Sequence, residues 1–186
     1  DRVKKVVTEL IKNGKISIDD YSLLPVNDKI AGDPVVNNLI EDQKKLVTTV
    51  ILEPLGMDYE RKVVETGFKL ECVEMGDIKG SNLGPLVADA INSYVNRNVK
   101  SGTDISMVAA GVIREKLLPG FETAPDIFRV MSMGRGNDNV PGYPLSRLYV
   151  TGKELKSIFE ILQVAYKSTP GNYCYYSGLK AEFDPE

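Results

Sequence analysis

The stretch "SNLGPLVADAINSYVNRN", residues 81–98, predicts a helix with a defined beginning. Ser81 or Asn82 is suited to cap this helix, and Pro85 fits its first turn, where a proline loses no hydrogen bond. Apolar residues then recur at helical spacing. They form one stripe of Leu86, Val87, Ala90, Ile91 and Tyr94. We therefore expect a helix over residues 84–97 that packs this stripe against a core.

The segments around this helix predict a layered fold of strands and helices. We expect strands at 62–66, in "ISMVAAGV" (105–112), in "RLYVTG" (147–152) and in "NYCYYSGLKAEFD" (172–184). A second helix is expected over residues 153–165, with its apolar side formed by Leu155, Ile158, Phe159 and Leu162. Strands and helices in this order indicate an α/β or α+β fold.

The N-terminal part predicts a β-hairpin followed by a helix. Residues 3–8 and 16–26 have strand character, and Asn13-Gly14 between them is a two-residue turn signal. Asp33 and Pro34 are suited to the N-cap and first position of a helix, which we expect to end before Pro54. Such a helix is typical of a linker between two domains, but a helix inside one domain would have the same pattern.

The composition excludes several classes of function. The chain has 186 residues, 42% of them hydrophobic, and a formal net charge of −3, so neither nucleic acid nor an anionic membrane is the expected partner. No segment is apolar enough for a membrane span. The sequence has no histidine, so metal sites with imidazole ligands and Ser–His or Cys–His nucleophiles cannot form within it. Cys72 and Cys174 are as compatible with two thiols as with a disulfide.

Four stretches together resemble the C-terminal domain of the 5'-nucleotidase family of metallophosphoesterases. They are "SNLGPLVADAI" (81–91), "DISMVAAGVIRE" (104–115), "LYVTGKELKSIFE" (148–160) and "YSGLKAEFDP" (176–185). The earlier stretch "YSLLPVNDKIAGDP" (21–34) is similar to the end of the family's catalytic domain. The resemblance implies that residues 1–33 end the metallophosphoesterase domain, 34–55 form a linker helix and 56–186 form a substrate-recognition domain. We expect this domain to be truncated, because the family's usual last segment is missing.

The resemblance also implies an activity for the intact protein. In this family a pair of divalent metal ions lies in the N-terminal domain, and the C-terminal domain provides the nucleoside pocket. The intact protein is then expected to be a phosphoric ester hydrolase of nucleotide catabolism that is periplasmic, secreted or held at the cell surface. This chain would lack the catalytic metal site and be inactive alone. Its expected partners are a nucleoside or nucleotide and the catalytic domain of the same protein.

The resemblance carries several substrate-binding residues over to this chain. The family pattern Asn-Gly-Gly-x-Ile-Arg is similar to "AAGVIR" (109–114), which keeps Gly111 and Arg114 and has Ala109 in place of the asparagine. Arg114 offers a fork of donors suited to a phosphate, a carboxylate or a ribose hydroxyl, or to a salt bridge at a strand end. We also place Asn82 and Lys79 at this pocket, because many members have an arginine where Lys79 stands.

Base recognition is where the sequence departs from the family pattern. The family holds the base between two aromatic rings, and here Met133 replaces the first ring and Tyr173 the second. The loop "GRGNDNVPG" (134–142) after Met133 is longer than usual, so the chain resembles a long-loop branch of the family. Tyr175 and Tyr176 should point to opposite faces of a strand, so at most one of them shares a side with Tyr173.

Three alternatives remain open from the sequence. Ala109 and Met133 are compatible with a ligand- or protein-binding module that has lost nucleotide recognition. A family hydrolase could instead act on another phosphoester, such as a nucleotide sugar or a cyclic nucleotide. An unrelated enzyme with a lysine or tyrosine base is the third alternative.

Overall fold

The computed structural model describes residues 2–12, 15–27, 29–72, 81–137, 139 and 141–182. The predicted turn at Asn13-Gly14 and the predicted ligand residue Lys79 lie outside these residues. The chain divides into two compact units, Asp1–Leu46 and Val47–Glu186. The predicted domain boundaries after residues 33 and 55 stay a prediction. No helix in the described ranges is long and apolar enough to cross a membrane.

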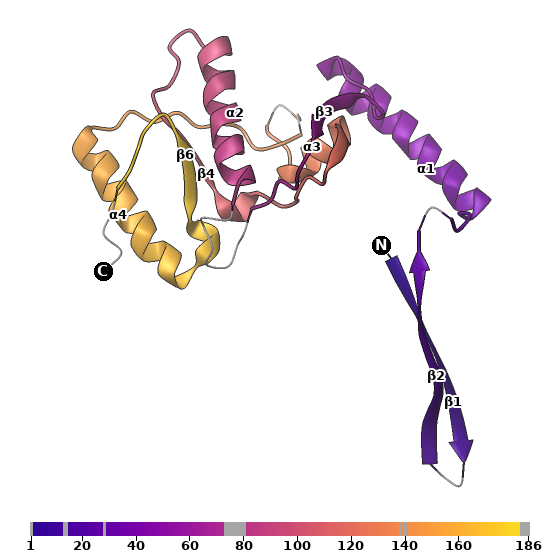
Figure 1. Cartoon of the computed structure of the whole chain (residues 1–186). Helices are drawn as coiled ribbons and strands as arrows, with labels where there is room; N and C mark the ends of the chain where they lie inside the picture. Colours follow the sequence, from indigo (N-terminus) through magenta and orange to yellow (C-terminus); the bar gives the residue numbers. More distant parts are fainter. Residues whose placement is uncertain are drawn as a thin grey trace. The chain divides into compact units, whose positions relative to one another are not determined.

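The first unit contains the predicted hairpin and helix (Figure 1). Strands β1 (Arg2–Lys12) and β2 (Lys15–Val26) pair antiparallel over their full length, with one irregularity near Thr8. Helix α1 (Pro34–Val47) follows, and Asp33 caps it as predicted, because its Oδ1 accepts hydrogen bonds from the backbone N–H groups at positions 35 and 36. No residue of α1 is buried.

The helical path continues beyond α1 with a different geometry. A π-helical turn (Thr48–Leu52) follows α1 directly and ends before Pro54, as predicted, and a 3₁₀ turn (Glu53–Leu55) then continues the path to residue 55. Pro54 is accommodated because it lies at the start of the 3₁₀ turn, where its missing N–H is not needed. The turn ends at Gly56, whose φ of 70° is left-handed.

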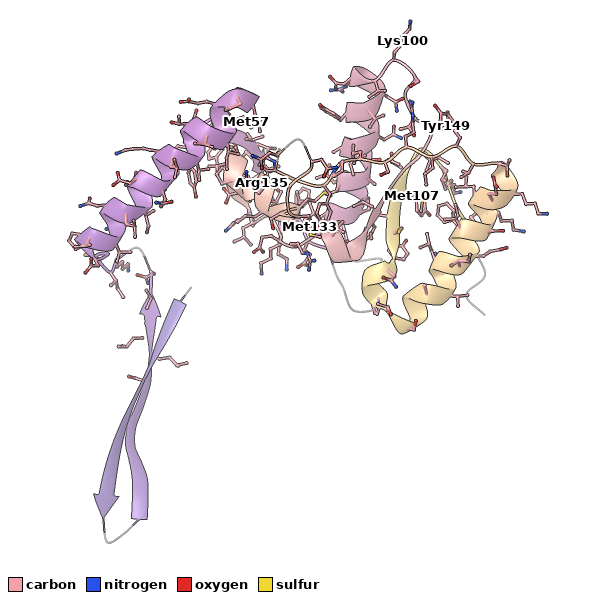
Figure 2. All side chains as sticks on the ribbon, turned by 180° about the vertical axis from the view of Figure 1, so that it is seen from behind. Met57, Lys100, Met107, Met133, Arg135 and Tyr149 are labelled. Carbon is pink, nitrogen blue, oxygen red and sulfur yellow. The ribbon has the colours of Figure 1, made fainter. Side chains whose placement is uncertain are left out.

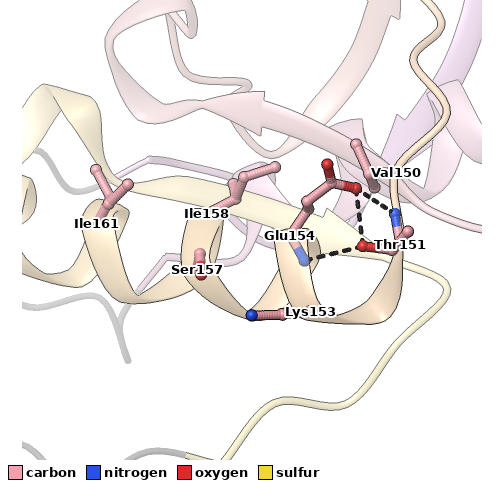
Figure 3. A pocket seen from close by; sticks show the side chains of 7 residues that line it. All are labelled: Val150, Thr151, Lys153, Glu154, Ser157, Ile158 and Ile161. Carbon is pink, nitrogen blue, oxygen red and sulfur yellow. Dashed lines mark hydrogen bonds between the residues drawn. The ribbon is translucent and has the colours of Figure 1, made fainter.

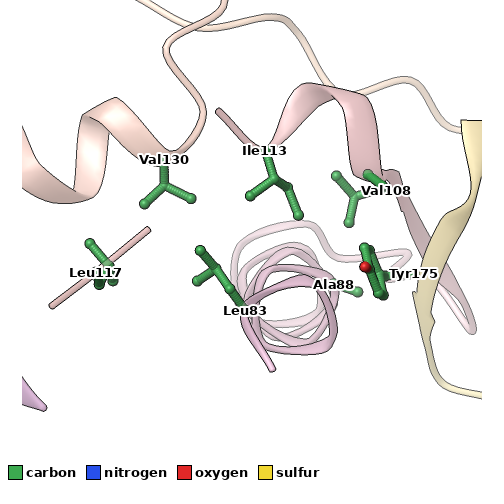
Figure 4. Packing of buried hydrophobic residues seen from close by; sticks show 8 residues of the cluster. Leu83, Ala88, Val108, Ile113, Leu117, Val130 and Tyr175 are labelled. Atoms are coloured by element: carbon green, nitrogen blue, oxygen red, sulfur yellow. The ribbon is translucent and has the colours of Figure 1, made fainter. Parts of the chain in front are cut away.

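The second unit has an α+β fold, as expected. Helix α2 (Leu83–Asn98) packs beside the antiparallel pair of β4 (Ser106–Ala109) and β6 (Cys174–Ser177) (Figure 1). These elements and the segments after β4 enclose the core shown in Figure 4. Its buried residues are Leu83, Ala88, Val108, Ala110, Ile113, Leu117, Val130 and Tyr175.

The predicted limits of α2 are confirmed to within one residue, but only Val87 and Ile91 of the predicted stripe pack against the core, and the fully buried residues are others. The buried residues are Leu83, Gly84 and Ala88, whereas Leu86 is 47% and Tyr94 64% exposed. The reason is that a large ring, Tyr175, lies against the helix at Gly84. The helix therefore approaches the Tyr175 ring at a glycine, which a pattern of large apolar residues cannot reveal.

A second strand pair lies next to a short helix. Strand β3 (Lys62–Thr66), as predicted, pairs antiparallel with β5 (Gly120–Thr123). Helix α3 (Ala124–Val130) follows β5 without a break and begins with a capping box of Thr123 and Asp126. The sequence pattern did not predict β5 or α3, since four and seven residues are too few for a periodic signal.

The last helix is confirmed and one predicted strand is wrong. Helix α4 (Gly152–Ser168) begins with a capping box of Thr151 and Glu154. Residues 143–151 have no regular structure, and Leu148 and Tyr149 are 79% and 83% exposed, so "RLYVTG" does not form the expected strand. The final strand, β6, is shorter than the predicted strand 172–184, because it pairs with β4 over four residues.

Candidate ligand-binding site

Arg114 and Met133 lie together, although 18 residues separate them in the sequence. The Arg114 Nε donates a hydrogen bond to Met133 Sδ, at 3.3 Å. The Arg114 backbone is held in place as well, since its N–H donates to the carbonyl of Val130 at 2.7 Å. The side chain of Arg114 is exposed and forms no ion pair with any residue that the structure describes. The fork of its two terminal nitrogens is therefore available to a ligand.

Met133 reaches Arg114 through a tight turn after α3. The helix ends at Val130, and the backbone N–H of Met131 donates to the Phe128 carbonyl at 3.2 Å. The N–H of Met133 then donates to the Met131 carbonyl at 2.8 Å, which reverses the chain direction. Met133 is half-buried, with its sulfur beside the guanidinium.

The loop 134–142 is closed at its base. The Gly142 N–H donates to the Gly134 carbonyl at 3.0 Å, and Arg135 pairs with Pro141 in an isolated β-bridge. Arg135 Nη1 also donates to Asn139 Oδ1 at 3.2 Å, so this guanidinium is held within the loop. Figure 2 shows Met133 and Arg135 near one another at the start of the loop.

Gly111 lies in a 3₁₀ turn, and Tyr173 directly follows a second 3₁₀ turn that lies beside the first. The turn Ala110–Val112 follows β4, and the turn Pro170–Asn172 precedes Tyr173. The N–H of Ala110 donates to the Tyr173 carbonyl at 2.7 Å, which joins the two turns. Gly111 is on the same turn, three residues before Arg114.

The three tyrosines near β6 are divided between two faces, as predicted. The rings of Tyr173 and Tyr175 meet edge to face with centroids 5.0 Å apart. Tyr176 points to the other side, where its ring centroid lies 5.1 Å from that of Phe159. Tyr173 is half-buried and packs against the core.

Asn82 has a structural role in addition to its predicted place at the site. Its Oδ1 accepts a hydrogen bond from the Glu71 N–H at 2.8 Å, and its Nδ2 donates to the Lys69 carbonyl at 3.0 Å. Asn82 occupies the N-cap position of α2, as predicted, but its side chain makes no capping hydrogen bond to the helix. The Asn82 side chain instead joins the start of α2 to residues 69–71. A contact of Asn82 with a ligand stays a prediction.

The two cysteines are free thiols, and one contacts Tyr175. The Cys72 Sγ donates to the Tyr175 hydroxyl at 3.3 Å. Burial, together with the hydrogen bond to Cys72, raises the pKa of Tyr175, so its phenol is not suited to act as a base near neutral pH. Burial also raises the pKa of the Cys174 thiol.

A hollow of about 640 Å³ lies along the beginning of α4 (Figure 3). It is lined by Val150, Thr151, Lys153, Glu154, Ser157, Ile158 and Ile161. The polar groups of Thr151 and Glu154 are occupied by each other, at 2.7 and 2.8 Å, because they form the capping box. The hollow is open, and it contains none of the predicted ligand residues. The candidate site at Arg114, Met133 and Tyr173 is the one predicted from the sequence, and of these residues Arg114 and Met133 are in contact.

The chain was compared with known proteins. A family model described as "5'-nucleotidase, C-terminal domain" matches residues 66–186, which contain every predicted ligand residue. A search of curated proteins found no match. The matched range covers most of the chain, and it includes all four stretches that carry the sequence resemblance. The chain therefore belongs to the family of 5'-nucleotidase C-terminal domains.

Proposed function

We propose that this chain recognises the nucleoside or nucleotide substrate of a 5'-nucleotidase-type phosphoester hydrolase. The observation that carries the proposal is the contact of 3.3 Å between Arg114 Nε and Met133 Sδ. It brings together two residues that the sequence assigns to one ligand. Membership of the family supports the same assignment.

Each residue would meet a different part of the ligand. The free end of the Arg114 guanidinium is suited to a phosphate or to ribose hydroxyl groups, which accept paired hydrogen bonds. The thioether of Met133 is a soft and polarisable surface for a base. The ring of half-buried Tyr173 would offer a stacking face.

The described residues do not fit the metal pair of the family. They include no group of three or more His, Cys, Asp or Glu side chains that could hold a metal ion, and the sequence has no histidine. We therefore assign no hydrolytic step to this chain. The proposal places the divalent metal pair in a catalytic domain of the same protein, outside the cytoplasm.

Calorimetric titration of the chain with adenosine, AMP and inorganic phosphate tests the proposal. Arg114→Ala should weaken AMP binding by about tenfold, the loss expected for a charge-assisted hydrogen bond. Arg97→Ala is the matched control, because Arg97 is an exposed arginine in the last turn of α2.

The stacking face is tested with Tyr173→Leu, which keeps an apolar side chain against the core. This variant should weaken the binding of adenosine and AMP but not the binding of inorganic phosphate. Tyr94→Leu, at an exposed tyrosine of α2, should leave the binding of all three compounds unchanged. A folded chain that binds none of the three compounds would contradict the proposal. It would favour a module that has lost nucleotide recognition.

A further inference from the structure

Gly111 and Gly171 form a close backbone contact that a side chain at position 111 would disturb. A Cβ built on Gly111 would lie 3.1 Å from the carbonyl oxygen of Gly171 and 3.6 Å from its Cα. Neither glycine has a positive φ, so the backbone conformation does not require glycine at these positions. Limited space is therefore the reason that a glycine suits position 111.

This contact lies between the two arms of the candidate site. One arm is the turn with Gly111, which continues to Arg114 and is held there by the carbonyl of Val130. The other arm is the turn with Gly171, which continues to Tyr173. The hydrogen bond from Ala110 to the Tyr173 carbonyl fastens the arms at one point, and the glycine contact determines how closely they approach.

We infer that Gly111 is a positioning residue, which sets the place of the Tyr173 ring through its contact with Gly171 instead of touching the ligand. This inference rests on the proposed function. A methyl group at position 111 must push the Gly171 carbonyl away by a few tenths of an ångström. Because Tyr173 follows that turn by one residue, its ring moves, while Arg114 keeps its bond to Val130.

The test compares Gly111→Ala with Gly67→Ala, since a Cβ at Gly67 has no neighbour within 4 Å. Gly111→Ala should weaken adenosine binding about five- to tenfold, which is part of the loss expected when the stacking ring is removed. It should leave ribose 5-phosphate, which has no base, unchanged. In a Tyr173→Leu background it should have no further effect on adenosine.

A direct ligand contact by Gly111 would give a different result. Gly111→Ala would then weaken adenosine binding by the same factor in the parent and in the Tyr173→Leu background. This result would overturn the inference. If Gly111→Ala weakens the binding of ribose 5-phosphate and adenosine equally, the inference is overturned as well, since general damage to the fold has that effect.

A measurement without ligand separates this inference from the proposed function. The tyrosines are isotopically labelled, and the NMR signals of the Tyr173 ring are assigned by their loss in Tyr173→Phe. Gly111→Ala should shift these signals. Gly67→Ala should leave them unchanged. If the chain binds no nucleoside but these signals shift, the proposed function fails and the positioning contact stands. Unchanged Tyr173 signals in Gly111→Ala overturn the inference whether or not a ligand binds.

Discussion

Tyr175 occupies the space that a side chain at Gly84 would need, since a Cβ built on Gly84 would lie 2.5 Å from Tyr175 Cγ. Tyr175 is only 4% exposed and Gly84 is buried, so neither the ring nor the helix has room to yield. Gly84→Ala should therefore lower the free energy of unfolding by about 3 kcal/mol or more. Thermal unfolding followed by circular dichroism measures the change.

Gly152→Ala is the matched control for this prediction. A Cβ at Gly152, in the first turn of α4, has no neighbour within 4 Å, so that variant should be as stable as the parent or slightly more stable. Equal unfolding temperatures for the two alanine variants would show that Tyr175 does not restrict position 84.

Removal of the Asn82 side chain should loosen the start of α2. Asn82→Ala loses two hydrogen bonds to the backbone of residues 69–71, which should lower the free energy of unfolding by about 1–2 kcal/mol. Asn98→Ala loses one exposed bond, to the Tyr94 carbonyl, and should cost less. Urea unfolding of both variants provides the comparison, and a larger loss for Asn98→Ala would contradict this role of Asn82.

Acid should weaken the capping box of α3. Burial opposes the charge of Asp126, but hydrogen bonds from the Thr123 hydroxyl and N–H and the charge of Arg129 outweigh it, so the pKa of Asp126 is lowered. A carboxyl group with a lowered pKa stabilises the fold above its unfolded pKa, and this stability is lost as the pH falls through the folded value. The loss should fall between about pH 5 and pH 2.

The free energy of unfolding, measured across this range, should decrease less in Asp126→Asn than in the parent. Asp89→Asn, which removes an exposed carboxylate of α2, is the control and should follow the parent. Parallel pH curves for all three proteins would mean that the Asp126 carboxylate contributes nothing to the stability of the capping box.

The Cys174 thiol should react slowly in the folded protein. Burial raises its pKa, so less of the reactive thiolate is present near neutral pH. We expect alkylation by iodoacetamide at pH 8 to be several times slower than in urea, and to accelerate as the pH is raised. Mass spectrometry of the peptide with Cys174, in a Cys72→Ser background, gives the rate. Equal rates in the folded and unfolded protein would contradict the prediction.

A ring at position 133 should strengthen base binding if the proposed function is correct. Met133→Phe replaces the thioether with an aromatic face, and one stacked ring contributes about 1–3 kcal/mol per base, so adenosine should bind roughly tenfold more tightly. Met133→Leu is the control, because it removes the sulfur that Arg114 contacts without adding a ring. If calorimetry shows that Met133→Phe binds adenosine more weakly than Met133→Leu does, the base does not lie at position 133.

Long elements with clear end signals could be predicted from the sequence. Asp33, Pro85 and the spacing of apolar residues place α1, α2 and α4 close to their observed limits. The strand expected at 147–152 failed because a strand depends on a partner elsewhere in the chain, and residues 143–151 have none among the described residues. The buried face of α2 was predicted only in part for a related reason, since Gly84 meets the ring of Tyr175.

The candidate site could be predicted as a set of residues but not as an arrangement. Family motifs identify Arg114 and Met133, yet their contact depends on the turn after α3, a helix too short to predict. The bonds of Asn82 to residues 69–71 carry no local signal either, because the partners are backbone groups 11 and 13 residues away. Gly171 has no sequence signal as a packing partner, since glycine is common in turns for other reasons.

The closed base of the loop 134–142 makes this loop a natural place for protein engineering. The hydrogen bond between Gly142 and the Gly134 carbonyl brings the two ends of the loop together, so the chain leaves and returns at one point. A fluorophore peptide or an affinity tag inserted between these two joined ends would leave the spacing of Gly134 and Gly142 unchanged. The loop could then report on ligand binding while the contact of Arg114 with Met133 is preserved.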